Sequence, residues 1–296
     1  MFYGGIEAGG TKFVCGIGNP QGEVIDKLVI PTTAPKETLS KVVEYFMQVQ
    51  SEHRLHGLGL ASFGPLDLNP TSDTYGFITS TPKQKWQHVN IKGELEKALN
   101  CEIPIDTDVN AAALAEYRWG AGINKNNVVY ITVGTGVGGG ALVNGQLLHG
   151  LLHPEMGHMR LGENNAESEF TGICPFHEHC LEGLASGPAI EAQWGIPAEK
   201  LPDDHPAWEI EAKYLAEGIT NIILILSPEI IILGGGVMQQ KKLFPKIHKH
   251  VQALLNNYIQ KPEIVEKIED YIVPAKLGKH AGLLGAIALA LVEEKS

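Results

Sequence analysis

Two glycine-and-threonine turns in this sequence have the composition of a phosphate-binding site. They are Gly9-Gly10-Thr11-Lys12, near the start of the chain, and Gly134-Thr135-Gly136, near its middle. Because glycine lacks a Cβ, backbone N–H groups in such turns can approach an anion closely, and the hydroxyl and ammonium groups add further donors. Neither turn matches the P-loop pattern G-x-x-x-x-G-K-[ST], and a single such turn is more often a plain hairpin. A third run, 234–236, follows the apolar segment 230–233, and three runs together favour a nucleotide site.

A carboxylate at Asp108 has the position of a general base. Phosphoryl transfer needs positioning, charge neutralisation and one group that accepts the proton of the attacking hydroxyl. Asp108 lies between an expected short strand, 103–105, and an expected helix that begins at Asn110. The carboxyl ends of strands line the ligand crevice in α/β sheets. On spacing alone, however, helix capping is the better interpretation, because Asp is favoured at N-caps.

Thiol and imidazole groups form a third constellation. Cys174, His177 and Cys180 are spaced at i, i+3 and i+6, and His158 lies upstream across a polar loop. Four such ligands suit a tetrahedral structural zinc ion, which would order a loop with few apolar residues. By composition alone, His179 could replace His177. The alternative is two buried cysteines among surface histidines, but four candidate ligands in so short a window favour zinc.

These groups must be positioned by two sets of strands and helices. A strand, a glycine turn and a returning strand are predicted at 4–17 and again at 128–143, which is weak internal symmetry. Other predicted strands are 57–63, 103–105 and 230–233, and the predicted helices are 39–50, 91–99, 110–119, 207–226 and 281–292. We expect an α/β chain with domains at 1–118 and 119–280, and a C-terminal helix (281–296) that packs on the first.

Composition excludes several classes of protein. The chain has 296 residues and a formal net charge of -11, so a broad nucleic-acid surface or an anionic membrane is not the expected partner. The N-terminus lacks a basic region followed by an apolar one, and the longest late apolar stretch is shorter than the roughly 20 residues that span a bilayer. We expect a cytoplasmic protein whose four cysteines are thiols or metal ligands.

Five segments, in this order, resemble the motifs of the ROK family of sugar kinases and repressors. They are GIEAGGTK (5–12), IPIDTDVNAAALAE (103–116), ITVGTGVGGG (131–140), HPEMGH (153–158) and CPFHEHCLEGLASGPA (174–189). The last is similar to the version in the bacterial zinc-containing fructokinases. The resemblance covers essentially the whole chain and implies the actin-like, hexokinase-like (ribonuclease H-like) ATPase fold, with two α/β domains and the active site in the interdomain cleft.

The resemblance also implies roles for individual residues. Asp108 aligns with the catalytic base, which reverses the capping interpretation. The implied sugar-binding residues are Thr107, Asp108, Glu155, His158 and Glu182. The implied ATP-binding residues are Gly9, Gly10, Thr11, Lys12, Thr132, Gly134, Thr135, Gly136, Pro188, Gly234, Gly235 and Gly236. The implied zinc ligands are His158, Cys174, His177 and Cys180.

Two positions depart from the family pattern. Thr107 stands where relatives often carry Asn, and Glu7 stands where they commonly carry Asp, near the phosphates and the magnesium shell. The first departure leaves one sugar contact open. The longer Glu7 side chain can still hold a metal-bound water.

The expected function is transfer of the γ-phosphoryl group of ATP to the 6-hydroxyl of fructose, with Mg²⁺ and structural Zn²⁺ and with a homodimer as the expected assembly. Kinases for glucose, mannose or N-acetylmannosamine remain alternatives, since a few hydroxyl contacts decide specificity. A DNA-binding repressor is disfavoured, because the first phosphate motif starts at Gly5 and leaves no room for a helix-turn-helix. A non-catalytic sugar-binding protein is disfavoured because Asp108, Lys12 and all three glycine runs are present.

Overall fold

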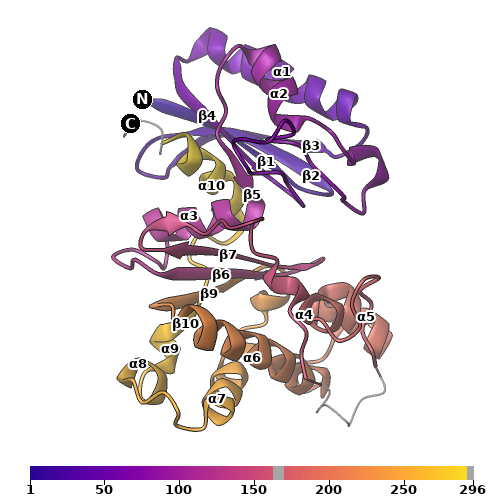
Figure 1. Cartoon of the computed structure of the whole chain (residues 1–296), viewed down its shortest axis with the longest axis vertical. Coiled ribbons are helices and arrows are strands. Elements are labelled where there is room, and N and C mark those ends of the chain that lie inside the picture. The colour runs from indigo at the N-terminus through magenta and orange to yellow at the C-terminus, as the bar shows by residue number, and fades with distance from the viewer. Residues whose placement is uncertain (163–169, 292–296) are drawn as a thin grey trace. The chain divides into compact units, whose positions relative to one another are not determined.

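The computed structural model describes residues 1–162 and 170–291 (Figure 1). Its contacts divide the chain into two compact units. Unit 1 holds Met1–Ile123, Leu147–Pro154 and the C-terminal residues from Lys279 on, and unit 2 holds Asn124–Gln146 and Glu155–Gly278. The domain boundary predicted between residues 118 and 119 therefore lies five residues before the boundary between the two units, which falls after Ile123. In addition, the segment 147–154 belongs to unit 1.

A five-stranded sheet forms the centre of unit 1, in the order β3-β2-β1-β4-β5. Its strands are β1 (Phe2–Ala8), β2 (Lys12–Gly18), β3 (Val24–Pro31), β4 (Leu55–Ser62) and β5 (Ile105–Thr107). β1, β2 and β3 pair antiparallel, whereas β4 and β5 continue the sheet in parallel with β1. The predicted strand-turn-strand at the start of the chain is confirmed. The strand predicted at 103–105 is corrected to 105–107, because only those residues pair with β4.

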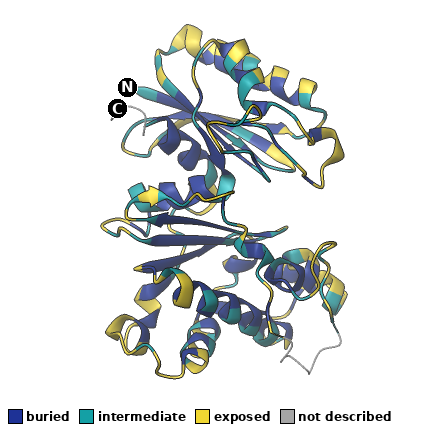
Figure 2. Cartoon of the chain, in the orientation of Figure 1, coloured by how far each residue is buried: buried dark blue, intermediate teal, exposed yellow. Residues whose placement is uncertain are grey.

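One face of this sheet carries the main apolar core of unit 1. The helices α1 (Pro35–Glu52) and α2 (Ile91–Leu99) and the turn η1 (Gln84–Trp86) cover it. Phe13, Phe46, Leu60 and Trp86 are buried in this layer. In Figure 2, much of this sheet has the dark blue of buried residues. Burial of such side chains stabilises the fold by about 1.5–3 kcal/mol each.

The other face of the sheet is covered by α10 (Ala281–Ala290), which also packs against α3 (Asp108–Trp119). This close packing needs glycine in the sheet: a Cβ on Gly59 would lie 2.1 Å from the carbonyl oxygen of Ala286. α10 is apolar all round and almost wholly buried, since the sheet lies on one side of it and α3 on the other. The predicted C-terminal helix is confirmed over 281–290, and residues 292–296 lie outside the described residues.

Unit 2 contains a second five-stranded sheet, in the order β10-β9-β6-β7-β8. Its strands are β6 (Val128–Val133), β7 (Val137–Val143), β8 (Gln146–Leu147), β9 (Ile230–Gly234) and β10 (Ile272–Pro274). β6 and β7 form a hairpin that repeats the β1–β2 plan of unit 1. The turn of this hairpin is short, because Gly138, Gly139 and Gly140 pair with β6 as part of β7.

Helices and single turns complete unit 2. The helices are α4 (Leu181–Ala185), α5 (Gly187–Trp194), α6 (Ala207–Leu226), α7 (Leu243–Leu255), α8 (Pro262–Val265) and α9 (Ile268–Tyr271). The turns are η2 (Met156–His158), η3 (Ala198–Lys200) and η4 (Val237–Gln239), and η5 (Gly278–His280) precedes α10. α6 matches its predicted range. No helix in the described part of the chain has the length and apolar character needed to cross a bilayer.

Candidate active site

Asp108 is the first residue of α3 and follows directly on β5 in unit 1. The helix is capped by Thr107, whose hydroxyl oxygen accepts the N–H of Asn110 at 3.1 Å. Asp108 is half-buried, and its Oδ1 accepts the N–H of Val109 at 2.9 Å. The structure therefore assigns the capping role to Thr107 and places Asp108 directly after β5, at the carboxyl end of that strand. Thr107 is buried and its hydroxyl forms this cap. The cap alone therefore explains why a hydroxyl side chain stands at this position, whether or not it also contacts a ligand.

Asp108 and Lys12 are electrostatic neighbours of Glu7 in unit 1. Burial, together with the charge of Asp108, raises the pKa of Glu7 to about 7, although Lys12 and the backbone at Leu283 oppose the shift. Two carboxylates and one ammonium thus share a small region at the ends of β1, β2 and β5. A divalent cation or its water shell fits this donor set, because Mg²⁺ binds through one or two carboxylates and keeps several waters.

The glycine turn between β1 and β2 is held by the chain that leaves β3. The N–H of Gly9 bonds to the carbonyl of Lys12 at 3.0 Å, which closes the turn. Thr32 fixes it from outside: its hydroxyl donates to the carbonyl of Gly9 at 2.8 Å, and its N–H donates to the carbonyl of Thr11 at 3.0 Å. Thr11 and Lys12 are exposed, so their side chains can reach a ligand at the turn.

Asp106 forms a network that sequence analysis missed. Its Oδ1 accepts from the side chain of Asn110 at 2.8 Å and from the N–H of Thr107 at 2.7 Å. Its Oδ2 lies 2.8 Å from Nε2 of His149, in the segment that returns to unit 1. This hydrogen bond raises the pKa of His149, against a lowering by burial. The network fixes the two residues that precede Asp108 and the first turn of α3.

We expect the Asp106–His149 pair to contribute stability that depends on pH. The folded-state pKa of His149 is raised, so its contribution is full below the unfolded value near 6.5 and is lost as the pH rises through the folded value. Because the His149 side chain is 41% exposed, solvent screening limits the effect of His149→Ala to about 1 kcal/mol of unfolding free energy. Denaturant titrations at about pH 5.5 and about pH 8.5 measure it.

The matched control for that pair is His149→Gln, which keeps a neutral donor near the Nε2 position. It should retain part of the stability but lose the extra stabilisation at low pH. An equal loss for His149→Ala at both pH values would contradict the charged interaction and leave only a neutral hydrogen bond.

A pocket of about 610 Å³ in unit 2 collects three of the predicted nucleotide-binding groups. Its lining includes Gly134 and Thr135 of the β6–β7 turn, Pro188 at the start of α5, and Gly236 after β9. Sequence analysis missed the remaining lining residues, which are Gly187, Glu191, Pro197, Ala198, Glu199, Val237, Gln239 and Gln240. Thr132 and Gly234, both predicted for ATP, pair with each other between β6 and β9 and are not among the described residues that line the pocket.

Backbone contacts explain why glycine is required around this pocket. The N–H of Gly187 donates to the carbonyl of Gly134 at 2.7 Å, which joins the start of α5 to the turn. Gly235 has a φ of 92°, a region that L-residues rarely adopt, and a Cβ there would lie 2.3 Å from the carbonyl oxygen of Val133. The three chain segments therefore approach each other through backbone alone.

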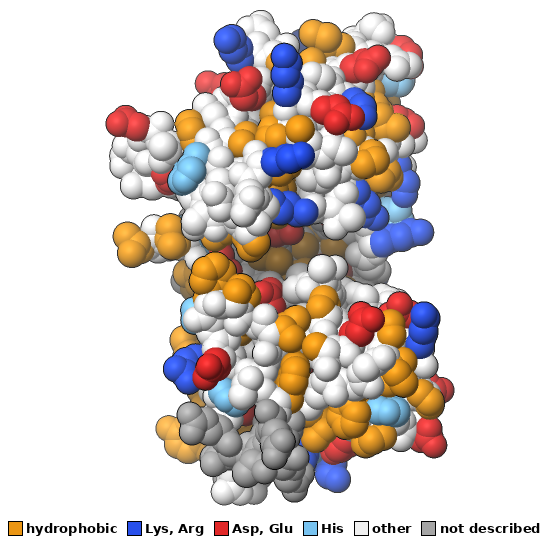
Figure 3. Space-filling view, turned by 90° about the vertical axis from the view of Figure 1, so that its right-hand side faces the viewer, with side chains coloured by type: hydrophobic (Ala, Val, Ile, Leu, Met, Phe, Trp, Pro, Cys, Tyr) orange, Lys and Arg blue, Asp and Glu red, His pale blue; other side chains and the backbone are white. Residues whose placement is uncertain are grey.

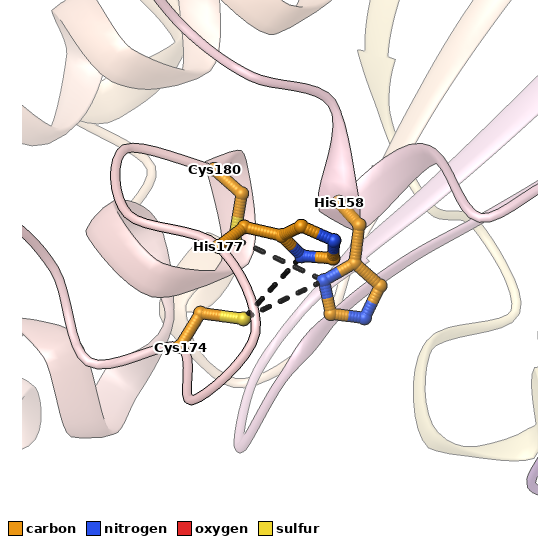
Figure 4. A group of neighbouring side chains, drawn as sticks. All are labelled: His158, Cys174, His177 and Cys180. Carbon is orange, nitrogen blue, oxygen red and sulfur yellow. Dashed lines mark hydrogen bonds between the residues drawn. The ribbon is translucent and has the colours of Figure 1, made fainter. Parts of the chain in front are cut away.

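The four predicted zinc ligands converge in unit 2. The donor atoms of His158, Cys174, His177 and Cys180 all lie within 4.8 Å of one another. Sγ of Cys174 is 3.8 Å from Nδ1 of His158 and 3.7 Å from Nδ1 of His177, and Sγ of Cys180 is 3.8 Å from Nδ1 of His158 (Figure 4). Ligands at zinc distances from a tetrahedral centre lie about 3.3–3.8 Å apart, so the donor set fits zinc. The reserve ligand His179 lies outside this cluster.

Glu182 lies beside both the ligand cluster and the glycine turn of unit 2. Its Oε2 accepts the N–H of Val137, directly after the turn, at 3.0 Å. Its Oε1 is 4.0 Å from Nε2 of His158. Cys180 caps α4, the helix that carries Glu182, by accepting the N–H of Gly183 at 3.3 Å.

Glu155, the other predicted sugar-binding glutamate, is exposed at the start of η2. His153 lies two residues before it, and Nε2 of His153 accepts the N–H of Leu66 at 3.1 Å.

A model of the ROK family matches residues 3–293 of the chain. The chain belongs to the ROK family. A fructokinase from Lactococcus lactis subsp. cremoris is 49% identical to it over 267 residues, which cover 90% of each chain. A fructokinase from Zymomonas mobilis subsp. mobilis is 42% identical over 99% of this chain and 97% of its own. The solved ROK hexokinase from Thermus thermophilus superimposes with a TM-score of 0.81 at 27% identity, covering 100% of this chain and 99% of its own.

The two α/β units have the hexokinase-like ATPase fold of the ROK family. In this ROK chain, the structure brings Asp108 and Lys12 each near Glu7 in unit 1. It brings the 134–136 turn, Pro188 and Gly236 together in unit 2, and it gathers all four zinc candidates there. The roles of these residues in binding and catalysis remain predictions.

Proposed function

We propose that this ROK protein is an ATP-dependent fructokinase that transfers the γ-phosphoryl group to the 6-hydroxyl of fructose. The placement of Asp108 carries the proposal: this residue directly follows β5, Thr107 takes the capping role, and Glu7 is its electrostatic neighbour. The fructokinase relatives, at 42% and 49% identity, support fructose as the substrate. ATP:hexose 6-phosphotransfer is the reaction class.

The proposed chemistry assigns one role to each group. Asp108 accepts the proton of the 6-hydroxyl as that oxygen forms its bond to the γ-phosphorus, and the bond from phosphorus to the bridging oxygen of ADP breaks. Lys12 and the backbone of both glycine turns neutralise the phosphate charge. Glu7 can hold water of the Mg²⁺ shell, and Mg²⁺, when bound, supplies charge neutralisation on the phosphates.

Substrate and nucleotide contacts follow the family pattern. The proposed sugar-hydroxyl ligands are Thr107, Asp108, Glu155, His158 and Glu182. The proposed ATP contacts are Gly9, Gly10, Thr11, Lys12, Thr132, Gly134, Thr135, Gly136, Pro188, Gly234, Gly235 and Gly236. The pocket of about 610 Å³ in unit 2 has the volume of a small-molecule site and supports four of the ATP contacts, Gly134, Thr135, Pro188 and Gly236, which line it.

We also propose that His158, Cys174, His177 and Cys180 hold a structural zinc ion. The donor separations near 3.8 Å support this, as does the chemistry of two thiolates and two imidazoles. Zinc would crosslink η2 to residues 174–180, which directly precede the helix α4 that carries Glu182. His158 would then act as a zinc ligand through Nδ1 and face Glu182 through Nε2.

We propose a cytoplasmic homodimer whose partners are ATP and a small sugar. On the face in Figure 3, acidic and basic side chains are interspersed, and the net charge is -11, which supports neither a nucleic acid nor an anionic membrane as a partner.

A coupled assay across a hexose panel tests the substrate. With ATP and Mg²⁺, we expect kcat/KM for fructose to exceed that for glucose, mannose and N-acetylmannosamine by at least about tenfold, because a mismatched hydroxyl leaves a polar group of the site unpaired. A clear preference for another hexose would reassign the substrate but keep the kinase. No phosphoryl transfer to any sugar would favour a non-catalytic sugar-binding protein.

A further inference from the structure

Lys83 lies directly over the glycine turn of unit 1. A Cβ placed on Gly10 would be 2.8 Å from Cε of Lys83 and 3.8 Å from its Nζ. Glycine at position 10 therefore leaves room for the Lys83 stem, and the ammonium group ends beside the turn. We propose that Lys83 is a second phosphate-binding cation, which acts with Lys12 on the phosphates of the nucleotide. This inference rests on the proposed assignment of the 9–12 turn to those phosphates.

A buried tryptophan fixes the turn that carries Lys83. The N–H of Trp86 donates to the carbonyl of Lys83 at 2.8 Å and closes η1. The Trp86 side chain is 2% exposed, with its ring centroid 5.3 Å from that of Phe13 and 5.8 Å from that of Phe63. Phe13 follows Lys12 in β2, so the same strand that leaves the glycine turn also supports the Lys83 turn.

Two adjacent residues hold the glycine turn and the Lys83 turn in register. Thr32 bonds to the carbonyls of Gly9 and Thr11, as described above. The carbonyl of Thr33, the next residue, accepts Nε1–H of Trp86 at 2.9 Å. The separation between Gly10 and Lys83 is therefore set by backbone and core contacts, although the Lys83 side chain itself is exposed.

The Lys83 ammonium is available to a ligand. Lys41, Lys92, Lys242 and Lys246 each pair with a carboxylate, whereas Lys83 makes no ion pair with any residue that the structure describes. A nucleotide triphosphate carries several negative charges, and cations aimed at its transferring group stabilise the transition state. A second ammonium beside the turn would serve this purpose. The alternative is that the Lys83 stem only packs on Gly10.

Three variants of the full chain separate charge from packing. Lys83→Met keeps the length of the stem and removes the charge, Lys83→Arg keeps the charge, and Lys85→Met is the matched control in the same exposed turn. For Lys83→Met we expect kcat/KM for ATP to fall about 10- to 100-fold, with KM for fructose within about twofold. Lys83→Arg should recover most of the activity, and Lys85→Met should match the wild type.

Equilibrium binding of AMPPNP gives a readout that does not depend on turnover. The dissociation constant should rise about tenfold in Lys83→Met and stay unchanged in Lys85→Met. Wild-type affinity and turnover in Lys83→Met would overturn the inference, as would wild-type protein that does not bind AMPPNP. If the wild type binds AMPPNP in a Lys83-dependent manner but does not phosphorylate fructose, the inference stands and the proposed fructokinase activity fails.

Discussion

Asp108→Asn is expected to lower kcat for fructose phosphorylation by about 10²–10⁴-fold and to leave fructose affinity within about threefold. The amide has nearly the size and hydrogen-bonding reach of the carboxylate, but it cannot accept the proton of the attacking hydroxyl. The Thr107 cap holds the start of α3 without Asp108, so the fold should persist. Stopped-assay turnover and calorimetric binding of fructose measure the two effects separately.

Asp106→Asn serves as the control for that variant, because it removes a carboxylate two positions away. It removes the charge from the hydrogen bond to His149, so we expect a loss of stability of about 1 kcal/mol and a kcat reduced less than tenfold. Glu7→Gln separates the contribution of the other nearby carboxylate from that of Asp108. If Asp108→Asn kept more than about a tenth of the wild-type kcat, the assignment of the general base would be wrong.

Removal of zinc is expected to weaken fructose binding at least about tenfold while AMPPNP affinity stays within about threefold. The reason is local: Cys180 caps α4, the next-but-one residue is Glu182, and His158 lies beside Glu182. Without the ion, η2 loses its crosslink to residues 174–180 ahead of α4, whereas the 134–136 turn keeps its strand pairing. Elemental analysis before and after chelation, followed by fructose and AMPPNP titrations, gives both values.

Ligand variants sharpen the zinc experiment. Cys174→Ser should abolish metal retention, whereas His179→Ala should retain about one zinc ion per chain, because His179 lies outside the cluster. Readdition of zinc to the chelated wild type should restore fructose affinity. Metal-free protein with unchanged fructose affinity would contradict the proposed role of zinc, and equal zinc loss in His179→Ala would contradict the ligand set.

Local patterns predicted most of the elements that position the site. The glycine hairpins are recognisable because apolar strands flank them, and α6 because its apolar residues recur with a helical period. β3 was missed, since five of its eight residues in succession are exposed on the edge of the sheet and carry no alternation. β5 was shifted because its limits depend on pairing with β4, which a single segment does not encode.

The site was predicted where its residues are close in sequence. The spacing of Cys174, His177 and Cys180 predicts a metal site, whereas Asp108 was predicted as the base only through the family resemblance, because its position before a helix favoured capping. Asp106 and His149 are separated by 43 residues, and Lys83 meets Gly10 only through contacts made by Trp86 and Thr33. Such long-range contacts leave no local pattern, so only the folded chain reveals them.

The central claim is phosphoryl transfer to one hydroxyl of fructose, and nuclear magnetic resonance of the reaction product tests it directly. Wild-type protein with ATP, Mg²⁺ and fructose should yield ADP and a single sugar phosphate whose phosphorus couples to the protons on carbon 6. Phosphate on any other carbon would contradict the proposed geometry around Asp108. Absence of a sugar phosphate would contradict the fructokinase proposal itself.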